Sequence, residues 1–207
     1  RPATGSAPSS DGSSGGGGSS SPSFAGGSGT ESSPYQIATA AQLDQVRNYL
    51  DKHFVLTADI DLSGYENWTP IGAFRPLSDA PEHVETPDPE AAFSGTFNGD
   101  GHTISNVRIN QPEGMFVGLF GCTVGQEDNP TSIYNLTVEN VDVTGFHLVG
   151  GVVGMQYSGC ILENVNLISE NTGDNTVCGN QGVGGITGIS FEDMKNCRAE
   201  ADIVVLG

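Results

Sequence analysis

Carboxylates are the most numerous ionisable side chains of this chain, and their grouping decides which chemistry they could perform. Asp59 and Asp61 alternate along one predicted strand and share a face, because side chains two residues apart in a strand point the same way. Glu139 and Asp142 lie on a later predicted strand, and residues 127–129 form an acidic loop. Repetitive β enzymes that cleave polysaccharides group such carboxylates on one outer face. None of these groups recurs in successive repeats, so we expect a solvated acidic surface and no catalytic residues.

Cysteine and histidine supply the other candidate chemistry. The four cysteines are Cys122, Cys160, Cys178 and Cys197. They allow three pairings if all are oxidised, and the sequence assigns none of them. The four histidines are scattered through strand starts and loops, at His53, His83, His102 and His147. No C-x-x-C pair and no H-E-x-x-H motif occurs, so we expect neither a zinc site nor metalloprotease activity. Calcium held by the acidic loops at 127–129 or 174–175 is the one metal alternative, and no other cofactor is expected.

The charge balance excludes several classes of partner. Lys and Arg total 7 against 25 Asp and Glu, for a formal net charge of -18. Nucleic-acid binding needs clustered cations, and docking on an anionic membrane surface needs them too. No apolar run approaches the ~20 residues that span a membrane. The chain also lacks an initiator Met and a signal peptide, which indicates a processed chain or a segment of a longer one.

The composition divides the chain near residue 34. Residues 1–33 are almost wholly Gly, Ser, Pro and Thr, and we expect a flexible tether; Phe24 is its one large apolar residue and could instead dock on a neighbouring subunit. Residues 34–207 form the folded part. A capping-box pattern begins a short amphipathic helix over 39–51, which we expect to cover the end of the core. Residues 75–92, rich in Pro, Asp and Glu, are expected to form a surface insertion.

Internal repeats carry the fold prediction. Four segments align without gaps around an asparagine: Ile104–Ile109, Ile133–Val138, Leu162–Leu167 and Met194–Ala199. Their asparagines are separated by 29, 29 and 32 residues. A glycine motif recurs out of phase at Phe116–Gly121, Val149–Gly154 and Val183–Gly188, with steps of 33 and 34 residues. Two motifs that alternate at this period indicate stacked supersecondary units, each unable to bury its apolar face alone.

The spacing of apolar residues inside each motif shows where the chain bends. Ile133, Leu136 and Val138 can share an inner face only if a corner separates the first from the second, and Asn135 tolerates the left-handed backbone of such a corner. Stacked in register, the corner residues would form an amide ladder of Asn106, Asn135, Asn164 and Asn196. The inner columns would be Ile104/Ile133/Leu162/Met194, Val107/Leu136/Val165/Cys197 and Leu119/Val152/Ile186.

These motifs resemble those of the GLUG-repeat family of bacterial cell-surface proteins, over residues 34–207. The opening of such domains is similar to Pro34–Ile37, to HFVLTADIDLSGYENWTPIG and to FSGTFNGDGHTISNVRI, and the motif that names them matches Gly118-Leu119-Phe120-Gly121. The resemblance implies an all-β, right-handed parallel β-solenoid of about four coils in exported, adhesin-like proteins. It also implies non-catalytic segments of some secreted immunoglobulin A peptidases, and no activity to carry over. Insertions at 75–92 and 171–181 depart from the pattern.

The last repeat bears on assembly. A fresh coil begins at Ala199, and Gly207 arrives before another glycine motif, so the final coil is incomplete. An uncovered end exposes strand edges that invite pairing. We therefore expect either that the chain continues past Gly207 or that this end stacks on another subunit.

Two functions remain from different classes. The preferred interpretation is a non-enzymatic extracellular or cell-surface module, adhesin-like or stalk-forming, which binds a glycan or a protein ligand. The alternative is a structural subunit that binds copies of itself end to end in an extracellular filament. A polysaccharide-acting enzyme is a distant third. A lyase would need a Lys or Arg base beside an acidic sugar, Lys52 and Lys195 are the only lysines, and the negative charge of the chain opposes anionic substrates.

Overall fold

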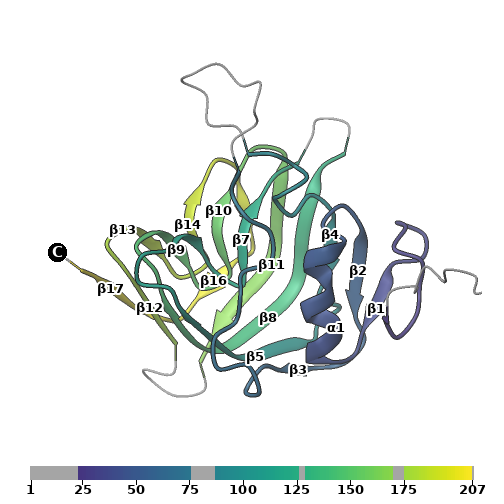
Figure 1. Cartoon of the computed structure of the whole chain (residues 1–207), viewed down its shortest axis with the longest axis horizontal. Helices are drawn as coiled ribbons and strands as arrows, with labels where there is room; N and C mark the ends of the chain where they lie inside the picture. Colours follow the sequence, from purple (N-terminus) through teal and green to yellow (C-terminus); the bar gives the residue numbers. More distant parts are fainter. Residues whose placement is uncertain (1–22, 76–86, 126–128, 170–174, 207) are drawn as a thin grey trace, which may run out of the picture.

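The computed structural model describes residues 23–75, 87–125, 129–169 and 175–206, and nearly all of its regular structure is β (Figure 1). All pairings between the named strands are parallel. The predicted all-β class is therefore confirmed. The elements are β1 (Tyr35–Ile37), α1 (Ala40–Gln45), the 3-10 helix η1 (Val46–Asn48), β2 (His53–Leu56), β3 (Ile60–Asp61), β4 (Thr96–Asn98), β5 (Thr103–Asn110), β6 (Met115–Val117), β7 (Phe120–Thr123), β8 (Thr131–Thr144), β9 (His147–Gly150), β10 (Val153–Gln156), β11 (Cys160–Ile168), β12 (Thr176–Gly179), β13 (Gln181–Gly184), β14 (Thr187–Ser190), β15 (Met194–Lys195), β16 (Arg198–Ala199) and β17 (Asp202–Val205).

The strands form one 11-stranded sheet and two 3-stranded sheets. The large sheet follows the order β1-β2-β4-β8-β11-β15, while the small sheets are β7-β10-β14 and β6-β9-β13. Each repeat of the sequence adds one strand to each small sheet, and we call one such turn of the chain a layer. Inward-pointing side chains of the sheets, of the helical segment and of the connecting segments make up the main core, whose largest members are Trp68, Phe54, Phe93, Phe97 and Phe120.

The long strand β8 contains two corners, and this changes part of the predicted stacking. Its backbone has positive φ at Asn135 (53°) and at Asn140 (50°). The residue beside Asn106 is Asn140, whose amide donates to the Asn106 side chain, and not Asn135 as predicted. β8 therefore has two corners: Asn135 stacks with Asn164, and Asn140 stacks with Asn106. The spacing of the repeats alone does not distinguish these two corners. The rest of the ladder is confirmed, because Asn164 donates to Asn135 Oδ1 at 3.0 Å and Asn196 follows in register.

The inner columns follow the same correction. Ile104 pairs with Val138 and Val107 with Val141, so neither heads its predicted column. The remaining members of the first two columns do stack, at Ile133/Leu162/Met194 and Leu136/Val165/Cys197. The third column, Leu119/Val152/Ile186, is confirmed by the register of the small sheet.

The glycine motif is explained by close approach of backbones. A Cβ added at Gly154 would lie 2.3 Å from the Phe116 carbonyl carbon and 2.6 Å from the Val117 nitrogen. At Gly150 it would lie 2.1 Å from the Val153 carbonyl oxygen. Only a residue without a side chain allows the two small sheets to meet this closely.

The first layer corrects the boundary of the predicted tether. Residues 1–22 lie outside the described residues, but residues 23–33 pack on the fold. Phe24 stacks on Tyr35 with ring centroids 4.5 Å apart and contacts Phe54 of the same chain at 5.7 Å. The Ala25 N–H donates to the Gln36 carbonyl at 2.9 Å, so this segment covers the edge of β1.

The predicted helix over 39–51 is shorter than expected. Thr39 caps α1 by accepting from the Gln42 N–H at 3.3 Å, and η1 ends at Asn48. The backbone that follows η1 forms hydrogen bonds outside the helix: the Leu50 carbonyl accepts from the Ser94 N–H at 2.9 Å. Leu43 and Val46 of this segment are fully buried in the main core.

The predicted surface insertion over 75–92 is also narrower. Its central residues, 76–86, lie outside the described residues. At its base Arg75 Nε donates to the Asp88 carboxylate at 2.8 Å, while Ala92 is fully buried beside Cys122. The last residues of the range therefore belong to the packed fold.

The last layer leaves large apolar side chains in solvent. Met194 is 43% exposed and Val205 is 64% exposed, whereas the equivalent residues of earlier layers are buried. Strands β15, β16 and β17 each have a parallel neighbour on one side only, among the described residues.

The corner asparagines predict a graded response to substitution. Asn164→Ala should lower the free energy of unfolding by about 2 kcal/mol, because a Cβ-bearing residue without a polar side chain pays about 1–2 kcal/mol for the left-handed backbone and the ladder hydrogen bond is lost as well. Asn164→Gly should lower it by about 1 kcal/mol, since glycine accepts this conformation. Urea denaturation of the two variants checks the order, and an alanine variant as stable as the glycine variant would contradict it.

Gly154→Ala tests the close approach of the small sheets. We expect a loss of about 2–3 kcal/mol or more in unfolding free energy, because the added methyl group overlaps backbone atoms that cannot move independently. Gly64→Ala is the matched control, since nothing lies within 4 Å of its added Cβ. The control should change the free energy of unfolding, measured by urea denaturation, by less than about 0.5 kcal/mol. Equal effects of the two substitutions would contradict this account of the glycine motif.

Candidate functional site

The structure uses the predicted acidic residues as acceptors for neighbouring layers. Asp59 Oδ1 accepts from the Thr103 N–H at 2.9 Å and contacts His102 Nδ1 at 3.1 Å. Asp61 Oδ1 accepts from the Asn106 amide at 2.7 Å. These hydrogen bonds hold the pKa of both carboxyls below the usual value. A carboxyl that stays ionised is a poor general acid. The hydrogen bonds of Asp59 and Asp61 instead hold neighbouring layers together.

The other predicted acidic residues are not brought together. Glu139 faces Ser105 in the register of β5 and β8, and Asp142 faces Arg108. Residues 126–128 and 170–174 lie outside the described residues. Asn175, at the end of the second predicted calcium loop, is buried and fully used: its side chain accepts from the Val141 N–H at 2.9 Å and donates to the Ile168 carbonyl at 2.6 Å. In the described part of the chain, no three His, Cys, Asp or Glu side chains gather as a metal site.

All four cysteines are free, and two of them are fully buried. Burial raises the pKa of the Cys122 and Cys160 thiols to about 12. Cys197 is half-buried and packs against the main core, as its predicted column requires; burial raises its pKa too. Thiols of this kind are weak nucleophiles at neutral pH.

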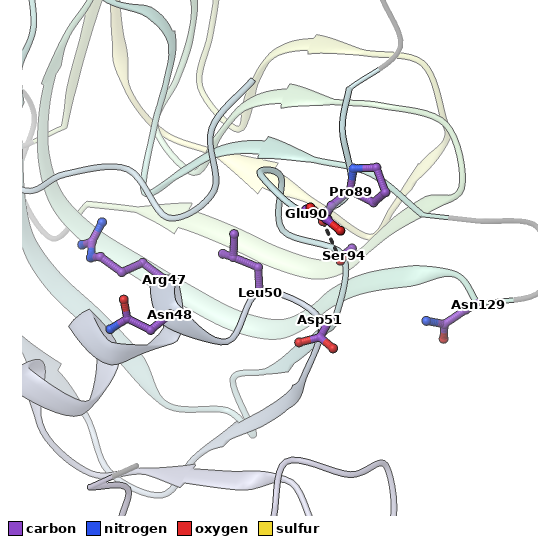
Figure 2. A pocket seen from close by; sticks show the side chains of 8 residues that line it. All are labelled: Arg47, Asn48, Leu50, Asp51, Pro89, Glu90, Ser94 and Asn129. Atoms are coloured by element: carbon purple, nitrogen blue, oxygen red, sulfur yellow. Dashed lines mark hydrogen bonds between the residues drawn. The ribbon is translucent and has the colours of Figure 1, made fainter. Parts of the chain in front are cut away.

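One surface hollow of about 430 Å³ lies beside the end of η1 (Figure 2). Its lining comprises Arg47, Asn48, Leu50, Asp51, Pro89, Glu90, Ser94 and Asn129. Figure 2 shows that Asn129 stands apart from the others and that the Ser94 hydroxyl donates to the Pro89 carbonyl, at 3.2 Å.

The strongest polar group of this hollow is already committed to the fold. The Arg47 guanidinium binds the Asp44 carboxylate at 2.6 Å and donates to the Thr69 carbonyl at 3.0 Å and the Pro70 carbonyl at 3.2 Å. It also lies over the Trp68 ring, 5.2 Å from the centroid. Arg47 therefore ties the helix to the first layer, and little binding capacity remains for a ligand.

A second hollow, of about 520 Å³, is largely apolar. Phe74 and Phe116 line it with ring centroids 4.6 Å apart, and Met115 stands beside them in solvent. Phe116 has a positive φ of 58°, as do Leu148 (55°) and Gly182 (62°) at the same place in the next layers. The unusual backbone is thus a corner repeated through the stack. Among the described residues, no ionisable side chain lines this hollow.

A third hollow, of about 410 Å³, lies on the outer face of the large sheet, and we call it the sheet groove. Its floor consists of two columns of outward-pointing side chains. One column is His53, Thr96, Ser132 and Ile161, and the other is Val55, Asn98, Tyr134 and Glu163. Glu31 and Pro34 line the groove beside the first layer.

Most polar groups of the sheet groove are not engaged by the fold. The His53 ring is fixed by a 2.8 Å contact between its Nδ1 and Thr96 Oγ1. Asn98 accepts from the Asp100 N–H at 2.9 Å through Oδ1, which leaves its amide N–H groups available. Among the described residues, the hydroxyl of Tyr134 and the carboxylate of Glu163 have no hydrogen-bond partner. Of the three hollows, this one keeps the most binding capacity.

Sequence reasoning did not single out the groove residues. The floor residues are ordinary outward-pointing positions of amphipathic strands, and only the register of four strands brings them together. One signal was present: Tyr134 and Glu163 both stand directly before a corner asparagine, so the repeat alignment places them side by side.

The chain spans only a small part of the length of the known proteins that it matches. No family model matches it. It is 38% identical over 152 residues to a "Putative Gly-rich membrane protein" of Evansella cellulosilytica, a match that covers 70% of this chain and 15% of that protein. It is 35% identical over 184 residues to halomucin of Haloquadratum walsbyi, a match that covers 86% of this chain and 2% of that protein.

One solved structure supports the fold. It is the crystal structure of a "putative immunoglobulin A1 protease" from Bacteroides ovatus, with a TM-score of 0.62 and 25% identity. The match covers 86% of this chain and 50% of that one. The chain is therefore similar to segments of surface or extracellular proteins. No described helix is long and apolar enough to cross a membrane.

The buried thiols predict selective alkylation. With iodoacetamide at pH 8, the half-buried Cys178 and Cys197 should react well before Cys122 and Cys160, whose raised pKa keeps them protonated and whose burial excludes the reagent. Peptide mass spectrometry over a time course measures the order, and urea should make all four react alike. Alkylation of native Cys122 as fast as Cys178 would contradict the placement of Cys122 in the core.

Proposed function

We propose that this chain is a non-enzymatic module of an extracellular surface protein, built as a right-handed β-solenoid of GLUG type. The observation that carries the proposal is the unbroken parallel register from β1 to β15, in which each repeat of the sequence stacks on the one before. Parallel strands joined by crossover connections are right-handed in the great majority of proteins. A stack of this kind grows in length without a change of cross-section, which suits a stalk or a presenting surface.

The chemistry of the described residues favours a binding or structural role over catalysis. The exposed carboxylates Asp59 and Asp61 are held ionised in hydrogen bonds between layers. The thiols that are best shielded from solvent are also the least ionised. Similarity to a protein named as a protease supports the fold of this chain and not an activity. Covalent catalysis would need a nucleophile paired with a base, and these carboxylates and thiols do not form such a pair.

A structural subunit of an extracellular filament is the second candidate. It is favoured by the exposed apolar residues of the last layer, among them Phe191, Met194, Ile203 and Val205. Covering such a surface with a further layer, from the same chain or another copy, would bury apolar area and complete the strand pairing. The covered edge of the first layer argues against simple head-to-tail stacking, because residues 24–33 pack along β1 and occupy the place of an incoming strand.

The purified chain tests both functions. We expect particles of monomer mass by light scattering over a concentration series, and single particles without filaments by electron microscopy. Regular filaments would instead establish the architectural alternative. Incubation with soluble polysaccharides and with immunoglobulin A1 should release neither reducing ends nor peptide fragments, and reproducible cleavage of either substrate would defeat the proposal of a non-enzymatic module.

A further inference from the structure

We propose that the sheet groove binds a short stretch of a neutral glycan, laid across the strands of the large sheet. The inference rests on the proposed surface function and names the class of ligand that such a module would hold. Its central residues are Asn98, Tyr134 and Glu163 from β4, β8 and β11, with Ser132 and His53 beside them.

The groove has the length and rigidity that an oligosaccharide site needs. Neighbouring strands lie about 4.8 Å apart, so the run from β2 to β11 extends over about 14 Å. The central strands β4 and β8 are hydrogen-bonded on both sides, by β2 and β8 in one case and by β4 and β11 in the other. Side chains on such strands hold their spacing before a ligand arrives, and this lowers the entropic cost of binding.

The chemistry of the groove matches that of sugars. A sugar presents hydroxyl groups that both donate and accept, together with an apolar C–H face. The groove offers a carboxylate acceptor at Glu163, amide donors at Asn98, and hydroxyls at Ser132 and Tyr134 that can do either. The half-buried ring of Tyr134 adds apolar area with a polar end, a combination common at binding surfaces.

Charge selects neutral glycans over anionic polymers. The chain carries a net charge of -18, and the groove itself contains Glu31 and Glu163 with no Lys or Arg in its lining. Acidic polysaccharides and nucleic acids would be repelled from it. A protein partner is disfavoured as well, because protein interfaces depend on a buried cluster of large apolar anchors. Here Ile161 is the one large apolar side chain of the lining that is exposed, and it lies near the half-buried Tyr134 ring.

The test measures binding to defined sugars by isothermal titration calorimetry of the full chain. The probes are cellohexaose, xylohexaose, mannohexaose and laminarihexaose, each at concentrations up to about 5 mM, at which a site with a Kd of about 1 mM is mostly occupied. Polygalacturonate serves as the anionic probe. We expect at least one neutral hexaose to bind and polygalacturonate not to bind. Absence of binding by all four neutral sugars, or binding of polygalacturonate alone, would overturn the proposal.

Matched variants locate the binding. Tyr134→Ala and Glu163→Gln should each weaken the affinity for the bound hexaose by about tenfold, and Tyr134→Phe by less, because it removes the hydroxyl and keeps the ring. Asp142→Asn is the control: it removes a carboxylate from the exposed face of the same strand β8, outside the groove, and should leave the affinity unchanged. Urea midpoints equal to that of the parent chain show that the variants are folded. Affinity unchanged in both Tyr134→Ala and Glu163→Gln would place the sugar elsewhere and overturn the assignment.

The two proposals fail in different ways. If no neutral sugar binds while the chain stays monomeric and cleaves nothing, the groove is rejected and the surface module stands. If the bound hexaose is shortened during the titration, as chromatography of the sugar would show, the non-enzymatic function is rejected even though the groove binds glycan.

Discussion

The fold depends on backbone corners that adopt the left-handed conformation at the same place in successive layers. A strand alternates its side chains between two faces, so a repeat whose apolar residues are three apart must change direction to keep both inside. The chain changes direction at Asn135 and at Asn164, each with a φ of 53°. The Asn164 side-chain amide also donates a hydrogen bond to Asn135 Oδ1. Glycines let the two small sheets approach where any side chain would overlap backbone. Parallel register, core columns and outer grooves all follow from these fixed corners.

Much of the fold could be predicted from residue spacing. The parity of apolar positions gave the column Leu119/Val152/Ile186 and the stacking of Ile133 under Leu162, both of which the strand registers confirm. The error concerned Asn106, because corners 29 and 34 residues apart both occur and every candidate residue is an asparagine. Only the hydrogen-bonded partner of β5, the second half of β8, distinguishes the two spacings. The packing of residues 23–33 could not be foreseen either, since one phenylalanine among glycines and serines supplies its contacts.

The candidate site was less accessible to sequence reasoning. A catalytic or metal motif concentrates unusual residues in a short stretch, whereas the sheet groove draws one or two ordinary residues from each of several layers. Asn98, Tyr134 and Glu163 are 36 and 29 positions apart along the chain, and the one local signal is the corner asparagine that follows Tyr134 and Glu163. The strand register brings them together, and the fold leaves the Tyr134 hydroxyl, the Glu163 carboxylate and the Asn98 amide N–H groups available to a ligand. The acidic pair Asp59 and Asp61 illustrates the converse: residues that stand out by type are occupied in holding layers together.

The two ends of the stack differ in how much backbone they leave free to pair. At the first layer, residues 24–33 pack along the edge of β1, while β15–β17 have neighbours on one side only, among the described residues. Each completed layer is therefore a template that presents N–H and C=O groups in the right order for the next strand. Adding a layer closes a loop of 33 or 34 residues in the small sheets, however many layers already exist. The entropic cost of growth is thus constant along the array, because loop-closure entropy depends on the length of the loop being closed. A chain of this design can fold in sequence from its first layer onward, each new layer forming on the one before it.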